Sequence, residues 1–215
     1  MTFDAVLCDL DGVLRHWPDT ADLEREHGVP PGTLAAVAFA PHRLLPAITG
    51  RRTDEEWRAA VAEDLRAHTP TAAELVAAWS SGTGSVDEEV AAVLATAGGP
   101  VVLVTNATTR LESDVDVLGL ARHVAGIVNS ALLGVAKPDP AIYLAAAEEA
   151  GTAPERCLFV DDSAANVAAA EALGMTGHHF TGVAGLRAVF ASRGWSPRAG
   201  SRPGRGGTPP PGPPR

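Results

Sequence analysis

The chain has 215 residues, 46% of them hydrophobic and 20% charged, which suits one substantial core with a small second domain. The formal net charge of −9, without a Lys/Arg cluster, argues against nucleic acid as the main partner. The apolar runs are shorter than the roughly 20 residues of a membrane-spanning helix, and the N-terminus lacks the pattern of a signal peptide. We therefore expect a cytoplasmic protein without a membrane partner, and the sequence indicates no particular oligomeric state.

Short Val- and Leu-rich runs alternate with longer helix-like segments along the chain, a pattern typical of a parallel sheet covered by helices. The predicted strands, in chain order, are 5–9, 101–105, 126–129, 157–161 and a weaker 177–180. The predicted fold class is α/β, with a Rossmann-like parallel sheet core and helices on both faces. Ligand sites in such sheets form at the carboxyl ends of the strands, where Asp9, Thr105 and Asp161 would lie.

About 90 residues separate the first two predicted strands, far more than a crossover connection requires. We expect an all-helical cap at 15–85, with helices at 54–67, capped by Thr53, and at 71–79. The catalytic core would comprise 1–14 and 86–195, joined to the cap by a hinge near 17–19 and 80–85. Residues 196–215, rich in Pro, Gly and Arg, predict a disordered tail.

Two carboxylates, Asp9 and Asp11, end the first predicted strand, and Gly12 after them permits a tight turn. Adjacent carboxylates repel each other and are stabilised by a divalent cation or by a proton on one of them, and both devices suit phosphoryl chemistry. Taken alone, the same Asp-x-Asp-Gly string also fits a fragment of a calcium loop or a polar turn.

Polar residues also follow two later apolar runs. Thr105 and Asn106 offer a hydroxyl and an amide to phosphate oxygens, or alternatively cap the next helix. Lys137 lies in a Pro-flanked segment that would hold its ammonium near the sheet edge, although a single lysine is more often a solvated surface charge.

Asp161 and Asp162 end a further predicted strand and open a helix that contains Asn166. Acidic residues suit a helix N-terminus regardless of catalysis. Together with Asp9 and Asp11, however, they would form a four-carboxylate site suited to a hard cation. The combination of the two motifs therefore indicates a cation site much more specifically than either motif alone.

In chain order, the strings Asp-Leu-Asp-Gly, Thr-Asn, Lys-Pro-Asp-Pro and Val-Asp-Asp-Ser-x-x-Asn resemble the motifs of the haloacid dehalogenase superfamily, over about residues 4–190. The cap after the first motif resembles the small helical cap of one phosphatase branch. The resemblance implies Mg²⁺-dependent hydrolysis of a small phosphorylated metabolite, with Asp9 as the nucleophile that forms an aspartyl-phosphate and Asp11 as general acid and base.

The resemblance also implies a role for each remaining motif. Thr105 and Lys137 would hold the phosphoryl group, and the backbone N–H of Asn106 would contact it. Mg²⁺ would bind Asp9, the backbone carbonyl of Asp11 and two further acids. These two acids are Asp162 and Asp161, the latter directly or through water.

Alternatives to a phosphatase remain on the same scaffold. Dehalogenases of the superfamily lack the second aspartate and the metal-binding acids, so Asp11, Asp161 and Asp162 argue against dehalogenation. A sugar-phosphate mutase begins with the same aspartyl-phosphate, and the motifs do not separate it from a phosphatase. The third alternative is a catalytically silent binding protein.

Substrate contacts are expected from the cap and from the segment that leaves the first motif. His16 and Trp17 follow the catalytic turn closely enough to contact the substrate. Arg51 and Arg52 would attract an anionic substrate, but a solvated loop is the favoured interpretation. Trp57 recurs with apolar residues at four-residue spacing, which predicts a core position.

Overall fold

A computed structural model describes residues 3–192 and contains a five-stranded parallel sheet in the order β5-β4-β1-β6-β7. The strands are β1 Ala5–Cys8, β4 Val101–Thr105, β5 Gly126–Asn129, β6 Cys157–Asp161 and β7 Thr176–His179. All five lie within one residue of the predicted bounds. The α/β fold class is therefore confirmed.

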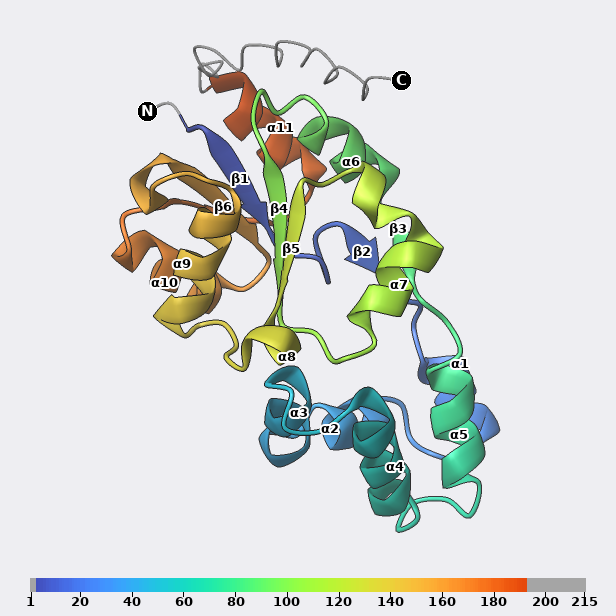
Figure 1. Ribbon diagram of the computed structural model, residues 1–215. Coiled ribbons are helices and arrows are strands. Elements are labelled where there is room, and N and C mark those ends of the chain that lie inside the picture. The colour runs from blue at the N-terminus through green and yellow to red at the C-terminus, as the bar shows by residue number, and fades with distance from the viewer. Residues whose placement is uncertain (1–2, 193–215) are drawn as a thin grey trace, which may run out of the picture.

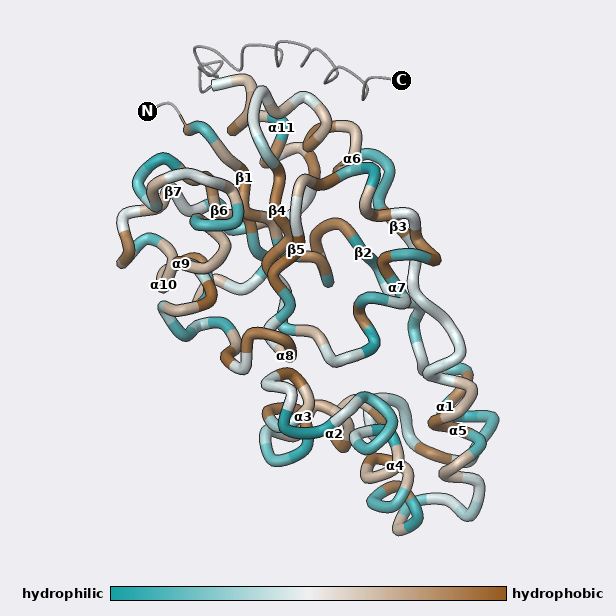
Figure 2. The backbone as a smooth tube through the Cα atoms, in the orientation of Figure 1, coloured by the Kyte–Doolittle hydropathy of each residue, from teal (hydrophilic) through white to brown (hydrophobic). Residues whose placement is uncertain are grey.

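The helices of the sheet domain are α6 Glu88–Leu94, α7 Leu111–Leu118, α8 Ser130–Leu133, α9 Pro140–Glu149, α10 Ala164–Ala172 and α11 Val183–Ser192, with 3-10 turns at Leu120–Arg122 and Pro154–Arg156. They cover both faces of the sheet (Figure 1). In β1, Val6 and Cys8 pack in the cluster under α6, α7 and α11, whereas Ala5 and Leu7 pack under α9 and α10. Burial on both sides explains the nearly continuous apolar strands, which Figure 2 shows in brown.

A separate group of helices lies between β2 (Arg15–His16) and β3 (Ser85–Val86). These cap helices are α1 Ala21–Glu26, α2 Thr33–Ala38, α3 Pro41–Ile48, α4 Asp54–Leu65 and α5 Ala72–Trp79. They pack around an apolar cluster of their own, which contains Trp57 and is distinct from the two clusters on the sheet. As predicted, Thr53 caps α4: its side chain accepts the backbone N–H of Glu56, and the Glu56 carboxylate accepts the Thr53 N–H.

The two chain segments that connect the cap helices to the sheet domain are paired with each other. β2 and β3 run antiparallel, with Arg15 opposite Val86 and His16 opposite Ser85. This pair lies directly beside the segments in which the sequence predicts a hinge. The predicted tail and the last residues of the predicted core lie outside the described residues, and within residues 3–192 no helix has the length and hydropathy to span a membrane.

Contacts between the cap helices and the sheet domain place α3 beside α8 (Figure 1) and join the start of α4 to the loop that follows β4. Thr108 Oγ1 donates to Asp54 Oδ1 at 2.7 Å, and the Asp54 N–H donates to Thr109 Oγ1 at 2.9 Å. Arg110 donates to the backbone carbonyls of Ser80 and Gly82 after α5. The cap helices therefore lie over the carboxyl edge of the sheet.

Candidate active site

Asp9 follows β1 directly, at the carboxyl edge of the sheet, and only 7% of its surface is exposed. Its Oδ1 accepts the Leu10 N–H at 2.7 Å and lies 2.8 Å from Lys137 Nζ. Burial raises the pKa of Asp9 to about 7, since the lowering effect of Lys137 is smaller and Asp161 adds to the rise. The Asp9 carboxyl therefore holds its proton up to a higher pH than an ordinary aspartate, and positive charge beside it favours the ionised form.

Lys137 is the only lysine in the chain, and 5% of its surface is exposed. Its Nζ lies 2.8 Å from Asp9 Oδ1 and 2.7 Å from Asp161 Oδ2. Burial lowers the pKa of Lys137, but Asp9 and Asp161 outweigh burial and raise it overall, so the ammonium stays charged. Lys137 is thus not a solvated surface charge.

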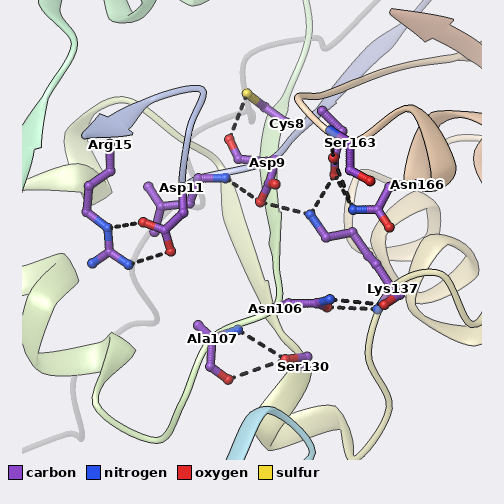
Figure 3. Close-up of polar contacts among 12 residues, drawn as sticks. Cys8, Asp9, Asp11, Arg15, Asn106, Ala107, Ser130, Lys137, Ser163 and Asn166 are labelled. Atoms are coloured by element: carbon purple, nitrogen blue, oxygen red, sulfur yellow. Dashed lines mark hydrogen bonds and ion pairs between the residues drawn. The ribbon is translucent and has the colours of Figure 1, made fainter. Parts of the chain in front are cut away.

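The amide of Asn106 holds the backbone of Lys137 in place (Figure 3). Its Nδ2 donates to the Lys137 carbonyl at 3.0 Å, and its Oδ1 accepts the Lys137 N–H at 2.7 Å. Ser130 Oγ closes the adjoining loop, because it accepts the Ala107 N–H at 3.1 Å and donates to the Ala107 carbonyl. Thr105 is buried at the end of β4, just before this loop. The contacts predicted between Thr105 or Asn106 and phosphate stay predictions.

Three carboxylates form a cluster suited to a cation: Asp9, Asp161 and Asp162 each offer an oxygen, and these oxygens lie within 4.8 Å of one another. The Asp161 carboxylate is fully buried and oriented by the Ser163 N–H at 2.8 Å and by Asn166 Nδ2 at 3.0 Å. Burial raises the pKa of Asp162, and the negative charge of Asp161 adds to this rise. Three carboxylates beside one ammonium leave an excess of negative charge, and oxygen donors of this kind fit Mg²⁺.

Gly12 permits the close approach of Asp162 to the first motif. Its φ is +82°, and a Cβ at this position would lie 2.2 Å from Asp162 Oδ2. The glycine is therefore required both for the turn and for the space that Asp162 occupies.

The Asp11 carboxylate lies outside this cluster, in an ion pair with Arg15. Arg15 Nε and Nη2 donate to its two oxygens at 2.7 and 2.9 Å, and Trp17 Nε1 donates to Oδ1 at 2.7 Å. Figure 3 shows the Asp11 side chain turned toward Arg15, on the opposite side of Asp9 from Lys137. Arg15 is itself buried and also donates to Asp114 Oδ2 at 2.9 Å.

Residues 3–174 match the haloacid dehalogenase-like hydrolase family, a stretch that includes all four motifs. The chain belongs to this family. The resemblance found in the sequence is thus confirmed at the level of family and fold.

Two curated relatives of this haloacid dehalogenase-like hydrolase match over short stretches. A CBBY-like protein from Arabidopsis thaliana is 60% identical over 40 residues, which are 19% of this chain and 12% of that protein. A sesquiterpene phosphatase from Aspergillus oryzae is 45% identical over 56 residues, which are 26% of this chain and 29% of that protein. The chain therefore aligns with less than a third of either relative.

Solved structures of the same family share the fold over most of this chain. A Bacteroides thetaiotaomicron enzyme of the family, in complex with magnesium and inorganic phosphate, is 21% identical with a TM-score of 0.64, over 82% of this chain and 93% of that one. The L-2-haloacid dehalogenase of Xanthobacter autotrophicus is 24% identical with a TM-score of 0.63, over 82% of this chain and 76% of that one. At these identities the likeness shows a common fold.

The predicted substrate residues of this hydrolase lie in different places. Trp17 lines a cavity between the cap helices and the sheet domain, whereas the exposed His16 lies 3.0 Å from Asp87 Oδ2 and lines a different depression. Trp57 is buried in the cap cluster, as predicted, and also lines the cavity. Arg51 and Arg52 are exposed and lie outside the cavity lining, in agreement with the solvated loop.

Sequence reasoning missed the ion-pair network under the cap helices. Arg110 Nε donates to Asp114 Oδ1 at 2.9 Å, and Asp114 in turn accepts from Arg15. A signal was present for Arg110 and Asp114, which are opposite charges four residues apart at the start of α7. No comparable signal links Asp114 to Arg15, which are 99 residues apart.

Proposed function

We propose that the protein is a Mg²⁺-dependent phosphatase that hydrolyses a small phosphate monoester through an aspartyl-phosphate on Asp9. The observation that carries the proposal is the buried contact of Lys137 with Asp9 and Asp161, with Asp162 beside them, at the carboxyl edge of the sheet. Two relatives support it: one is named a sesquiterpene phosphatase, and the other was solved with magnesium and phosphate. Asp161 and Asp162 also favour phosphoryl transfer over dehalogenation, since dehalogenation needs no metal-binding acids.

Asp9, Asp161 and Asp162 would hold Mg²⁺, with the predicted help of the Asp11 backbone carbonyl. The bound ion would supply positive charge to the phosphoryl oxygens as their charge redistributes. Lys137, which contacts Asp9 and Asp161, would supply further positive charge, and Thr105 would donate its hydroxyl to a phosphoryl oxygen.

In the first step, an oxygen of Asp9 attacks phosphorus and the ester P–O bond breaks, with its electron pair passing to the leaving oxygen. The Asp11 carboxyl gives its proton to that oxygen, which releases the alcohol. In the second step, Asp11 takes a proton from water, whose oxygen attacks phosphorus. The bond between phosphorus and Asp9 then breaks with its electron pair returning to the Asp9 carboxylate, inorganic phosphate is released, and Asp11 holds its proton again.

Asp11 needs a rearrangement before it performs this role. Its two oxygens accept hydrogen bonds from Arg15 and Trp17, and the side chain faces away from Lys137 (Figure 3). Because Arg15 and Trp17 lie on the segment that leads into the cap helices, a hinge motion at β2 would change these donors. We propose that, as the substrate binds, the Asp11 carboxyl gives up its hydrogen bonds with Arg15 and contacts the leaving oxygen of the ester instead.

The experiment is phosphate release from a panel of phosphate monoesters, with Mg²⁺ and with chelator, by wild type and Asp9→Asn. Asp116→Asn serves as the matched control, because Asp116 is exposed on α7 and undergoes the same chemical change. We expect Mg²⁺-dependent release that falls by at least about 1,000-fold in Asp9→Asn and is unchanged in Asp116→Asn.

The same assay separates the alternatives. Release at the wild-type rate by folded Asp9→Asn would refute the nucleophile. Consumption of a sugar phosphate with formation of an isomeric phosphate, and no free phosphate, would indicate a mutase. Silence toward every ester, with Mg²⁺ bound, would indicate a binding protein.

A further inference from the structure

A cavity of about 450 Å³ lies between the cap helices and the carboxyl edge of the sheet. Its volume falls within the range of small-molecule sites. At one end it is bounded by Asp11 and Asn106, which place it next to Asp9 and Lys137. It is therefore positioned to receive the part of an ester that lies beyond the phosphoryl group.

The far wall of this cap cavity is apolar and strongly aromatic. Its main members are Phe39, Leu44, Ile48, Trp57 and Trp79. The rings of Phe39, Trp57 and Trp79 contact one another, with centroids 5.5 to 6.3 Å apart. All tryptophans within residues 3–192 thus line this cavity, with Trp17 at the end where it donates to Asp11.

Part of the apolar cavity lining is left exposed by the described residues. Phe39 is 52% exposed and Trp17 is 43% exposed, although both are large and apolar. Large exposed apolar side chains that gather around a cavity mark a binding surface more often than scattered ones do. The apolar surface lost from water on binding would here come from the ligand and from these two rings.

The charged residues that line the cavity neutralise one another. Arg15 pairs with Asp11 and Asp114, and Arg110 also pairs with Asp114. At the α4 side, Arg58 Nη2 lies 2.6 Å from Asp54 Oδ2. A second anionic group on the substrate would have to break one of these partly buried pairs, which is costly because it leaves a carboxylate without a partner.

We propose that the leaving group is a bulky apolar alcohol, so that the substrate is a phosphate monoester with a hydrocarbon or aromatic body. This inference rests on the proposed function, because it places the phosphoryl group at Asp9 and the body of the alcohol in the cap cavity. Sugar phosphates and esters with a second anion are poor substrates on this reasoning, since the wall offers them few unpaired polar groups.

The test uses linear alkyl monophosphates from ethyl to decyl, with glucose 6-phosphate and phosphoglycolate as polar references. Each methylene that enters the cavity raises kcat/KM by up to about 4-fold, and the gain ends once the chain fills the cavity. The polar references react no faster than ethyl phosphate.

A substitution in the cavity wall tests whether the wall binds the hydrocarbon chain of the substrate. Phe39→Ala should lower kcat/KM for octyl phosphate by about 10-fold more than it lowers kcat/KM for ethyl phosphate. Leu144→Ala is the matched control, because Leu144 is 47% exposed on α9, away from the cavity. Neither residue belongs to the catalytic edge.

A binding measurement gives a readout that does not need turnover. Asp9→Asn protein is titrated with octyl phosphate and with ethyl phosphate in the presence of Mg²⁺, and tryptophan fluorescence is followed, because Trp17, Trp57 and Trp79 line the cavity. Octyl phosphate should change the fluorescence at much lower concentration, and the change should weaken in Asp9→Asn combined with Phe39→Ala.

The outcomes distinguish the two proposals. Turnover of ethyl phosphate or sugar phosphates without any gain from chain length overturns the apolar leaving group and keeps the phosphatase. Tight binding of octyl phosphate without turnover of any ester by wild type keeps the apolar site and overturns the phosphatase. Equal fluorescence responses to octyl and ethyl phosphate count against the apolar site.

Discussion

Replacement of Lys137 by Met tests the electrostatics of the carboxyl edge. Lys137 Nζ contacts two buried carboxylates, at 2.8 Å on Asp9 and 2.7 Å on Asp161, and methionine keeps most of the side-chain length without the charge. Removal of one partner from a buried ion pair costs about 3–5 kcal/mol, because the remaining charge stays desolvated. For a chain of this size, that free energy corresponds to a fall in Tm of about 6–20 °C.

The loss of stability should depend on pH. The pKa of Lys137 is raised above its ordinary 10.5, so its charge stabilises the fold at every pH below that value. Lys137 also lowers the pKa of Asp9, which burial raises to about 7. Without the lysine, Asp9 binds a proton more readily, and protonation relieves the unpaired charge at low pH. The variant is therefore destabilised less at pH 5.5 than at pH 8.

The assay is thermal unfolding of wild type and Lys137→Met at both pH values, with chelator and then with Mg²⁺. Arg66→Met is the control, since Arg66 pairs with Glu63 at an exposed position where an ion pair contributes about 1 kcal/mol or less. A fall in Tm no larger than that of Arg66→Met, or equal at pH 5.5 and pH 8, would show that Lys137 does not balance the buried carboxylates.

Two further predictions concern the cation. The pKa of Asp9 is about 7 in the fold and ordinarily 3.8, so the metal-free fold binds more protons than the unfolded chain between these values and loses stability as pH rises through them. Mg²⁺ binding measured by calorimetry should accordingly tighten from pH 5.5 to pH 8, because the ion then no longer competes with a proton on Asp9. A constant affinity would contradict the assignment of Asp9 as a ligand. Gly12→Ala should weaken Mg²⁺ binding at least about 10-fold, since its Cβ would lie 2.2 Å from Asp162 Oδ2, and an unchanged dissociation constant would mean that Asp162 is not needed.

The strands were predictable because burial on both faces requires continuous apolar runs, and each clear run is followed by polar residues such as Asp9, Thr105 or Asp161. Asp9 follows β1 and Asp161 ends the neighbouring parallel strand β6, so their proximity follows from topology alone. The helices α1, α2 and α3 were not predicted individually. Two of them have only six residues, and α3 contains Pro46, so local propensity is weak and packing in the cap cluster decides their conformation.

Side-chain direction was the part that sequence spacing did not reveal. The pattern predicts that Asp11 lies near the carboxyl edge of the sheet, but it does not predict the direction of its side chain. That direction depends on Arg15, which Asp114 of α7 also holds. The Asn106 side chain offered either an amide to phosphate or a helix cap, whereas its amide is occupied by the backbone of Lys137; the contact predicted for its backbone N–H stays a prediction. Both features depend on contacts between segments far apart in the chain, which periodicity does not encode.

The pairing of β2 with β3 has a consequence for how the cap can be exchanged. His16 and Ser85 lie opposite each other, so a cut at these two points leaves chain ends about one strand spacing apart. A two-residue turn is long enough to join such ends. The whole segment from 17 to 84 can therefore be replaced as a module, with a different wall for the cavity and the same carboxylates beneath it.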